Sequence, residues 1–534
     1  MVNILLLFLL LTCAFGDGAS SSSAEKCTID SDCLPYNSCH NELCAHKEIF
    51  QLEGLEWVGS VILLIVSIIA NAGGVGGSVI CTSLLLLLFY FNPHQAVALT
   101  QSFVFAGSFT SVALKIKDRH PTRNRPLIYY DMLMQLCSPL LLGVSIGVMV
   151  NPGFPGWLIL AMLTLAVFYL GINGFIKAAS LYKIESQAKA LKEKQNADAE
   201  KEQEINKNIA EEFKHQHSES DANLKINKAE KNFEGNHNDF SQNNSADSER
   251  NSLDSLSNAS KNQKETPKDT NTKGFVDDKK NVDYKDISSE LQEKINKIHK
   301  SEEKIISLFH LIYFVLLALF SILFTLLKGS NSYKSIIGIS SCSVGFGMVI
   351  IGYVISMLLL SLYSSVYLVR KTKICESANY NFEVGDIHWY PKKCIIFIIA
   401  GFITGILVGI LGLSAGYIIG SILLFLKVRP EITTTSTSFT ITITSFTAMI
   451  QFFIEGIIDW KYALWLMGAS SLGALVGILV LRKQVVKRGR SSILIYGFSA
   501  ILAGSFIIIP TVGIINTLKQ VDKGTFIIGF KNIC

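Results

Sequence analysis

Long apolar blocks alternate with short polar connections along most of this chain. About twenty apolar residues suffice to cross the hydrocarbon core of a bilayer, and blocks of this kind are predicted at 96–114, 131–150, 156–176, 305–327, 335–369, 432–454, 462–481 and 491–510. Two further stretches, 57–91 and 394–426, are longer and are interrupted by glycine-rich sequence. A soluble core would not need so many blocks, so the pattern predicts an all-α polytopic membrane protein.

One long polar segment divides the apolar blocks into two groups. Residues 183–304 are rich in Lys, Glu, Asn, Asp and Ser and contain few large apolar side chains. Such a segment buries too little surface to offset its ordering entropy, so we expect disorder with transient helix near 183–213. The predicted organisation is a first repeat (54–176), a charged cytoplasmic loop (177–304), two linking transmembrane segments (305–369), a cytoplasmic loop (370–393), a second repeat (394–510) and a tail (511–534).

The N-terminal residues are typical of a secreted or lumenal segment. Residues 1–16 are short, apolar and end in small residues, which favours a signal peptide over a membrane anchor, although no Lys or Arg precedes the apolar run. Residues 17–50 contain Cys27, Cys33, Cys39 and Cys44. Two disulfides of undetermined pairing are expected in an oxidising compartment; a zinc site is the alternative, but the C-x2-C spacing of common zinc modules is missing.

The distribution of basic residues predicts the orientation of the spans. The loops 115–125 and 482–490 are rich in Lys and Arg, whereas 151–153 and 455–459 contain neither, so the first two should be cytoplasmic. Counting from a lumenal N-terminus, 57–91 then begins and ends on the lumenal side and 394–426 on the cytoplasmic side. Each is therefore a hairpin, spanning or re-entrant, that opens one of two inverted repeats, unless one span is miscounted.

The glycine-rich interruptions are the main candidates for a substrate site. Non-helical backbone inside a membrane survives where it lines protein or a watery cavity. A helix that restarts after such a break points its N-terminus at it and can donate N–H groups to an anion. The candidates are Gly73, Gly74, Gly76, Gly77 and Ser78 in the first half and Gly412, Ser414 and Gly416 in the second. The alternative is that these small residues only allow close helix packing.

Polar side chains downstream of each break are further candidates. Gln101 and Ser102 follow the first break, and Thr435 and Ser436 lie in a hydroxyl-rich run after the second. Amide and hydroxyl groups can solvate an anion without the cost of a buried charge, although Ser and Thr in membrane helices often bond their own backbone.

Composition limits the function classes. The chain has 534 residues, 17% charged, with a net charge of +5 and a mean hydropathy of +0.37, which gives no reason to invoke nucleic acid. No familiar catalytic motif is present, so we predict no enzyme, no cofactor and no metal. Acidic residues are missing from the interior of the spans, which argues against a cation carrier. The expected partners are a small anion, the lipid bilayer and, for oligomerisation, a second copy of the chain as a homodimer.

Several of these segments resemble the TauE/SafE sulfite exporter family, also called the 4-toluene sulfonate uptake permease family. The matching segments are 71–77, 92–102, 119–121, 125–128, 139–143, 459–465 and 489–492. The signal sequence, cysteine-rich cap and long central loop look like the eukaryotic branch, in a secretory-pathway or plasma membrane. The resemblance implies transport of sulfite, organosulfonates or related anions. Residues 411–416 depart from the family pattern because Leu413, Ser414 and Ala415 stand where more glycine is usual. The competing hypothesis from another class is a non-transporting receptor or scaffold whose cap binds a ligand.

Overall fold

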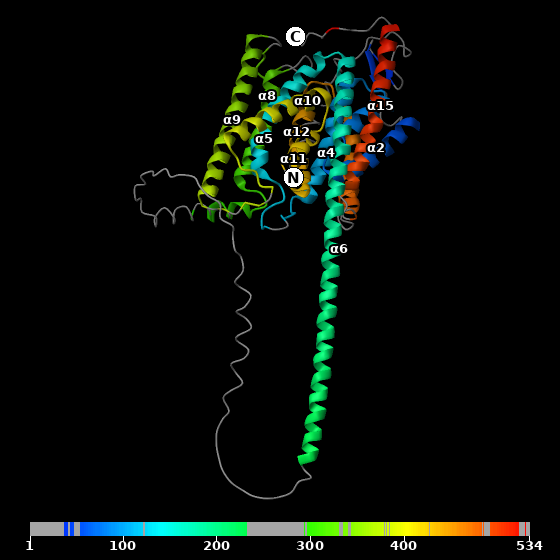
Figure 1. The fold of residues 1–534 in the computed structure, drawn as a ribbon. Helices are drawn as coiled ribbons and strands as arrows, with labels where there is room; N and C mark the ends of the chain where they lie inside the picture. The colour runs from blue at the N-terminus through cyan, green and yellow to red at the C-terminus, as the bar shows by residue number, and fades with distance from the viewer. Residues whose placement is uncertain are drawn as a thin grey trace, which may run out of the picture. The chain divides into compact units, whose positions relative to one another are not determined.

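The protein is a helical membrane bundle. The computed structural model describes most of residues 54–231, 300–329, 343–482 and 492–522, with shorter pieces at 37–40, 43–46, 296–298 and 335–339. Within these residues, nine helices are long and apolar enough to cross a membrane. This confirms the predicted multi-pass helical fold, and Figure 1 shows the helices packed side by side.

The helices follow the same order in the two halves of the chain. The first half contains α2 (Gly54–Gly73), α3 (Ser78–Leu87), α4 (Pro93–Lys115), α5 (Tyr130–Val150) and α6 (Gly156–Lys231). The linking helices are α8 (Leu308–Lys328) and α9 (Val344–Ser377). The second half contains α10 (Pro391–Leu411), α11 (Ala415–Phe425), α12 (Pro430–Ile454), α13 (Trp460–Val476), which continues as a π-helix over Gly477–Arg482, and α15 (Ser492–Asp522). A long helix, a break and a short helix thus open each half.

Local sequence sets several helix starts. The side chain of Asn92 accepts a hydrogen bond from the backbone N–H of Gln95 at 2.9 Å, and Pro93 occupies the first turn of α4. Asp459 caps α13 in a similar way by accepting from the N–H of Lys461 at 2.9 Å. A side-chain acceptor before the first turn satisfies a free N–H, and proline there loses no helical hydrogen bond.

The two halves are held together by close contacts between glycine-bearing helices. α5 packs along α10, and a Cβ added at Gly405 would lie 2.1 Å from the carbonyl oxygen of Leu140. α13 packs along α2, and a Cβ at Gly477 would lie 2.2 Å from the carbonyl oxygen of Ile68. Small residues let membrane helices approach until their backbones touch. The first helix of each half therefore packs on the third full-length helix of the other half.

We expect Gly405→Ala to weaken the α5–α10 contact. The new methyl group overlaps backbone atoms, which cannot rotate away, so the helices must separate. Overpacking of this kind costs about 1–3 kcal/mol. The free energy of unfolding in detergent measures the effect, with Gly468→Ala as the control because no atom lies within 4 Å of its added Cβ. Equal stability of the two variants would contradict the close packing.

Some boundaries differ from the predicted ones. α6 continues to Lys231, past the end of the predicted membrane block at residue 176. By its internal contacts the chain divides into one unit of residues 1–186 and 286–534 and another of residues 187–285. The extension is explained by Lys, Glu and Ala, which favour helix, and by pairs such as Lys189–Glu193 at 3.7 Å. α15 runs to Asp522, into the predicted tail.

The predicted signal peptide and most of the cap lie outside the described residues. Two short strands, β1 (Asn37–His40) and β2 (Leu43–His46), form an antiparallel hairpin with Cys39 opposite Cys44. Cys39 is disulfide-bonded. Cys27 and Cys33 are not described, so the pairing of the four cysteines stays a prediction.

Candidate functional site

The first glycine-rich interruption is a tight, left-handed break between α2 and α3. Gly74, Gly76 and Gly77 have φ angles of +70°, +87° and +69°. Glycine occupies this region readily because it has no Cβ. α3 then begins at Ser78, and Gly77 cannot cap it with a side chain, so the N–H groups of its first turn face the break.

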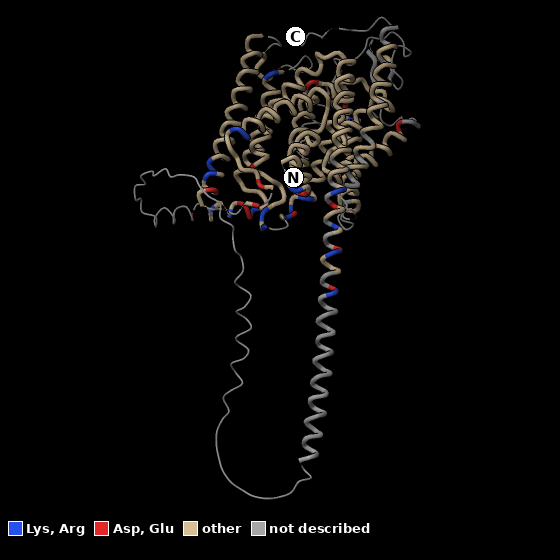
Figure 2. Tube along the Cα trace, viewed as in Figure 1, with Lys and Arg blue, Asp and Glu red and all other residues tan. Residues whose placement is uncertain are grey.

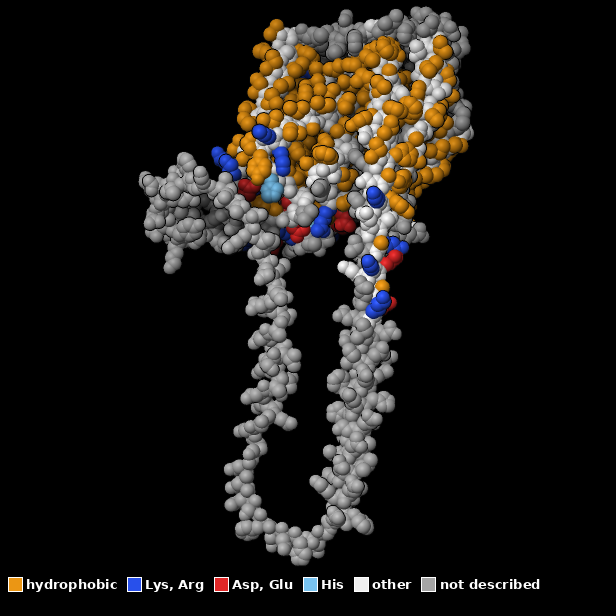
Figure 3. Space-filling view, in the orientation of Figure 1, with side chains coloured by type: hydrophobic (Ala, Val, Ile, Leu, Met, Phe, Trp, Pro, Cys, Tyr) orange, Lys and Arg blue, Asp and Glu red, His pale blue; other side chains and the backbone are white. Residues whose placement is uncertain are grey.

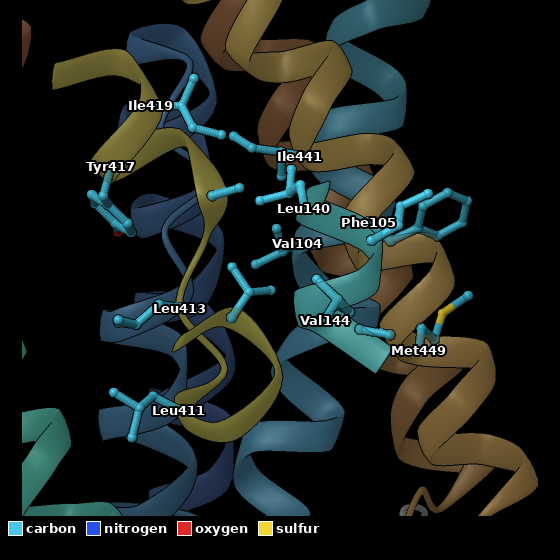
Figure 4. Packing of buried hydrophobic residues seen from close by; sticks show 14 of the residues in the cluster. Val104, Phe105, Leu140, Val144, Leu411, Leu413, Tyr417, Ile419, Ile441 and Met449 are labelled. Atoms are coloured by element: carbon cyan, nitrogen blue, oxygen red, sulfur yellow. The ribbon is translucent and has the colours of Figure 1, made fainter. Parts of the chain in front are cut away.

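The second interruption needs only one glycine in a left-handed conformation. Gly412 has a φ of +70°, whereas Ser414 has a φ of −79°, and Leu413 and Ala415 are not among the residues with positive φ. The departure from the family pattern at these three positions therefore causes no backbone strain. Figure 4 shows this turn, with Leu411, Leu413 and Tyr417 following one another along it.

The two breaks meet inside the bundle. The backbone N–H of Ser414 donates to the hydroxyl of Ser78 at 2.7 Å. A Cβ added at Gly76 would lie 2.8 Å from Ser414 Oγ, and one added at Gly416 would lie 3.4 Å from the carbonyl oxygen of Gly74. The N-terminal ends of α3 and α11, which are far apart in the sequence, are therefore neighbours, as the sequence interpretation required.

α4 and α12 enclose the paired breaks. The hydroxyl of Thr437 on α12 donates to the carbonyl oxygen of Gly74 at 3.2 Å, and a Cβ at Gly74 would lie 2.8 Å from the carbonyl oxygen of Thr434. On the other side, a Cβ at Gly412 would lie 3.2 Å from Cα of Val97 on α4. Thr437 belongs to the hydroxyl-rich run 433–438 that the sequence indicated as a whole, although Thr435 and Ser436 were the residues singled out in it.

Three of the candidate side chains are buried and keep polar atoms without a hydrogen-bond partner among the described residues. These atoms are Gln101 Oε1, Ser102 Oγ and Ser414 Oγ, on residues that are at most 1% exposed. The amide nitrogen of Gln101 is 3.5 Å from the carbonyl oxygen of Val408 on α10. Buried polar groups normally find a partner, so the unused hydrogen-bonding atoms of Gln101, Ser102 and Ser414 are consistent with a bound polar solute.

The other candidates have different surroundings. Thr435 donates to the carbonyl oxygen of Glu431 in its own helix at 2.9 Å. The hydroxyl of Ser436 accepts from the backbone N–H of Tyr129 at 3.0 Å, which ties α12 to the loop before α5. An added Cβ at Gly73 would contact only Val75, its neighbour in the break. The contacts of these three residues therefore support structural roles.

Charged side chains gather near the ends of the helices. Figures 2 and 3 show Lys, Arg, Asp and Glu at one end of the bundle and a largely hydrophobic surface above it. The other end contains a buried ion pair, in which Lys328 Nζ lies 3.1 Å from Glu455 Oε1. Burial raises the pKa of the Glu455 carboxyl, although Lys328 opposes this shift.

A cavity lies at the charged end, beside the loop that precedes α5. Arg125 Nη2 is 2.6 Å from Asp386 Oδ1, and Lys371 Nζ is 2.7 Å from Asp131 Oδ2. Burial lowers the pKa of His120, which also lines the cavity, and the nearby Arg125 guanidinium adds to this effect. The sequence interpretation assigned this loop to the cytoplasm and did not place a cavity there.

Known proteins resemble this chain over most of its length. A protein-family profile described as Sulfite exporter TauE/SafE matches residues 60–209 and 301–506. Sulfite exporter TauE/SafE family protein 3 of Arabidopsis thaliana is 24% identical over 87% of this chain and 79% of its own length. Family protein 1 of the same plant is 21% identical over 89% of this chain and 88% of its own length. The probable membrane transporter protein YunE of Bacillus subtilis is 25% identical over 28% of this chain and 54% of its own length. No solved structure matches.

Proposed function

The chain belongs to the sulfite exporter TauE/SafE family, and we propose that it carries a small anion, such as sulfite, an organosulfonate or a related oxyanion, across a membrane. The relatives are named as exporters and as a probable membrane transporter, which supports transport rather than catalysis. The proposed substrate class is oxyanions because the buried site offers donors and helix N-termini.

The meeting of two helix N-termini is the observation that carries this proposal. Ser414 N–H points at Ser78 Oγ at the start of α3, and neither α3 nor α11 has a side-chain cap on its first turn. Each N-terminus acts as roughly half a positive charge. We propose that an oxyanion takes the place of the Ser78 hydroxyl as acceptor and receives further hydrogen bonds from Gln101 Nε2 and Ser102 Oγ.

We further propose that the halves are inverted repeats that work by alternating access. Two observations support this arrangement. The helices follow the same order in the two halves, and the first helix of each half packs on a helix of the other half, α10 on α5 and α2 on α13. Rocking of one half against the other would open the breaks to each face in turn. The proposed orientation places the N-terminal cap, stapled by disulfides, in the lumen or outside the cell, and the basic loops in the cytoplasm.

Flux through purified protein in liposomes tests the proposal. We expect at least one anion from a panel of sulfite, sulfate and toluene sulfonate to cross, and protein-free liposomes give the background. If the folded protein moves none of them, the receptor or scaffold hypothesis replaces transport. The exchange of labelled for unlabelled anion, which needs no gradient, is the preferred format.

We expect Gln101→Leu to reduce the flux of the transported anion. The substitution removes an amide donor and keeps a side chain of similar size, and a hydrogen bond to a charged group contributes about 1.5–3 kcal/mol. The apparent affinity should therefore fall by about tenfold or more. Gln95→Leu, on the first turn of the same helix, is the matched control. Equal affinity in both variants would remove Gln101 from the site.

A further inference from the structure

The cavity beside the basic loop contains a histidine in a half-buried, charged cluster. His310 lies in the first turn of α8, and its Nε2 is 3.5 Å from Asp131 Oδ1. The other oxygen of Asp131 contacts Lys371 Nζ at 2.7 Å, and Lys371 also contacts Glu302 Oε1 at 3.0 Å. The His310 and Asp131 side chains are 13% and 17% exposed, so water screens the contact only in part.

The cluster ties together three separate parts of the chain. Asp131 belongs to α5, Lys371 to α9, and Glu302 to the segment that precedes α8. Tyr380, in the connection after α9, donates to Glu302 Oε2 at 3.1 Å. The cluster therefore acts as a latch that joins these three parts beside the cavity.

The latch lacks one positive charge. Asp131 and Glu302 together carry two negative charges, and Lys371 supplies one positive charge. A proton on His310 supplies the second and makes the cluster neutral.

Other charged and titratable groups also surround His310. The ring of Tyr130 lies 5.6 Å from the imidazole, and Arg125 is already paired with Asp386. The remaining charged and titratable groups that line the cavity are Lys304, Tyr129, Tyr367 and His120.

The latch is connected to the paired breaks through α12. Tyr130 packs against both His310 and Phe439 of α12, with ring centroids 5.6 and 5.8 Å apart. The adjacent Tyr129 N–H donates to Ser436 of α12. One residue further along, Thr437 contacts the carbonyl oxygen of Gly74. Two contacts, Tyr129 to Ser436 and Thr437 to Gly74, therefore link the N-terminal end of α5 to the first break.

We propose that His310 and Asp131 form a proton-binding site that holds the basic-loop face of the transporter closed when it is protonated. His310 takes the proton from water in the cavity and returns it there. This inference rests on the proposed transport function. A protonated imidazole strengthens the latch through a close, partly buried contact. The positive charge of the imidazole acts only weakly on an anion in the solution outside the cavity, because dissolved salt screens the interaction between them.

The direction of the pH dependence follows from this geometry. Deprotonation of His310 leaves a net negative charge in the latch, weakens it and frees the N-terminal end of α5 to move relative to α8 and α9. Exchange should therefore be slow in acid and faster at higher pH. An anion whose own charge stays fixed is the appropriate probe, since any pH effect then comes from the protein.

The experiment measures exchange of toluene sulfonate or sulfate, whichever the liposome panel shows to be carried, between about pH 5 and pH 8. We expect the wild-type rate to rise by about tenfold over this range. His310→Gln, which cannot be protonated, should be fast at every pH, and His310→Lys, which stays charged, should be slow at every pH. His388→Gln, a half-exposed histidine paired with Glu376 outside the cavity lining, is the matched control and should keep the wild-type profile.

Two outcomes would overturn the inference, and they can be told apart. If His310→Gln exchanges anion and keeps the wild-type pH profile, the proposed proton-binding site is wrong, whereas the proposed transport function is supported. If the folded wild-type protein exchanges no anion at any pH, the proposed function fails and the proton site fails with it. The retained exchange of His310→Gln also shows that this variant is folded.

Discussion

We expect transport to be lost when Gly74 or Gly76 is replaced by leucine. Both residues have φ angles that side-chain-bearing residues rarely adopt, at +70° and +87°. Forcing another L-residue into this region costs roughly 1–2 kcal/mol. The added Cβ would also lie 2.8 Å from the carbonyl oxygen of Thr434 or 2.8 Å from Ser414 Oγ. The helix N-termini then cannot approach each other, so we expect flux to fall to the background of empty liposomes.

The control separates a damaged site from a damaged fold. Gly468 lies on α13, and nothing lies within 4 Å of its added Cβ, so Gly468→Leu should transport normally. Size-exclusion behaviour and helical content show whether each variant is folded. Gly74→Ala and Gly76→Ala, which add a single methyl group, should transport more slowly than the wild type. Normal flux in both leucine variants would return these glycines to a packing role.

Lys328→Ala should cause a large loss of stability. The lysine ends α8 and contacts Glu455, at the C-terminal end of α12, with side chains 7% and 8% exposed. Removing the lysine leaves a buried carboxylate without its partner, which costs about 3–5 kcal/mol. Chemical unfolding in detergent measures this loss.

Two further variants test whether the loss comes from the unpaired charge. Lys373→Ala, an exposed lysine on α9, should change the stability by no more than about 0.5 kcal/mol. The double variant Lys328→Met with Glu455→Gln removes both charges and should recover most of the lost stability, since a buried pair often contributes little net free energy. A stable Lys328→Ala protein would show that water reaches Glu455.

Hydropathy and glycine spacing predicted the helices and the two breaks, because these features depend on short stretches of sequence. The positions of Gly74, Gly76 and Gly412 were enough to locate the interruptions, and the family was recognisable from the segments around them. The helical extension of α6 to Lys231 was underestimated, because polarity was given more weight than helix propensity.

Contacts between distant segments could not be predicted from the same patterns. Neither periodicity nor composition indicates that Lys328 pairs with Glu455, or that Asp131 lies between His310 and Lys371. Thr437 was missed because every residue from Thr433 to Ser438 bears a hydroxyl, and the sequence does not say which of them faces a glycine. Which hydroxyl of a helix faces a given glycine depends on how the two helices are rotated about their axes relative to each other.

The packing of α5 on α10 and of α2 on α13, each between the two halves of the chain, also has a consequence for how the protein folds during synthesis. When the first half leaves the ribosome, the surfaces of α2 and α5 that pack on α13 and α10 have no protein to cover them, since their partners are encoded hundreds of residues later. We expect the newly synthesised first half to stay in the lipid, or bound to an insertion factor, until the second half has been translated. We therefore expect that neither half folds fully without the other, and that a truncated product is recognised by quality control as incomplete.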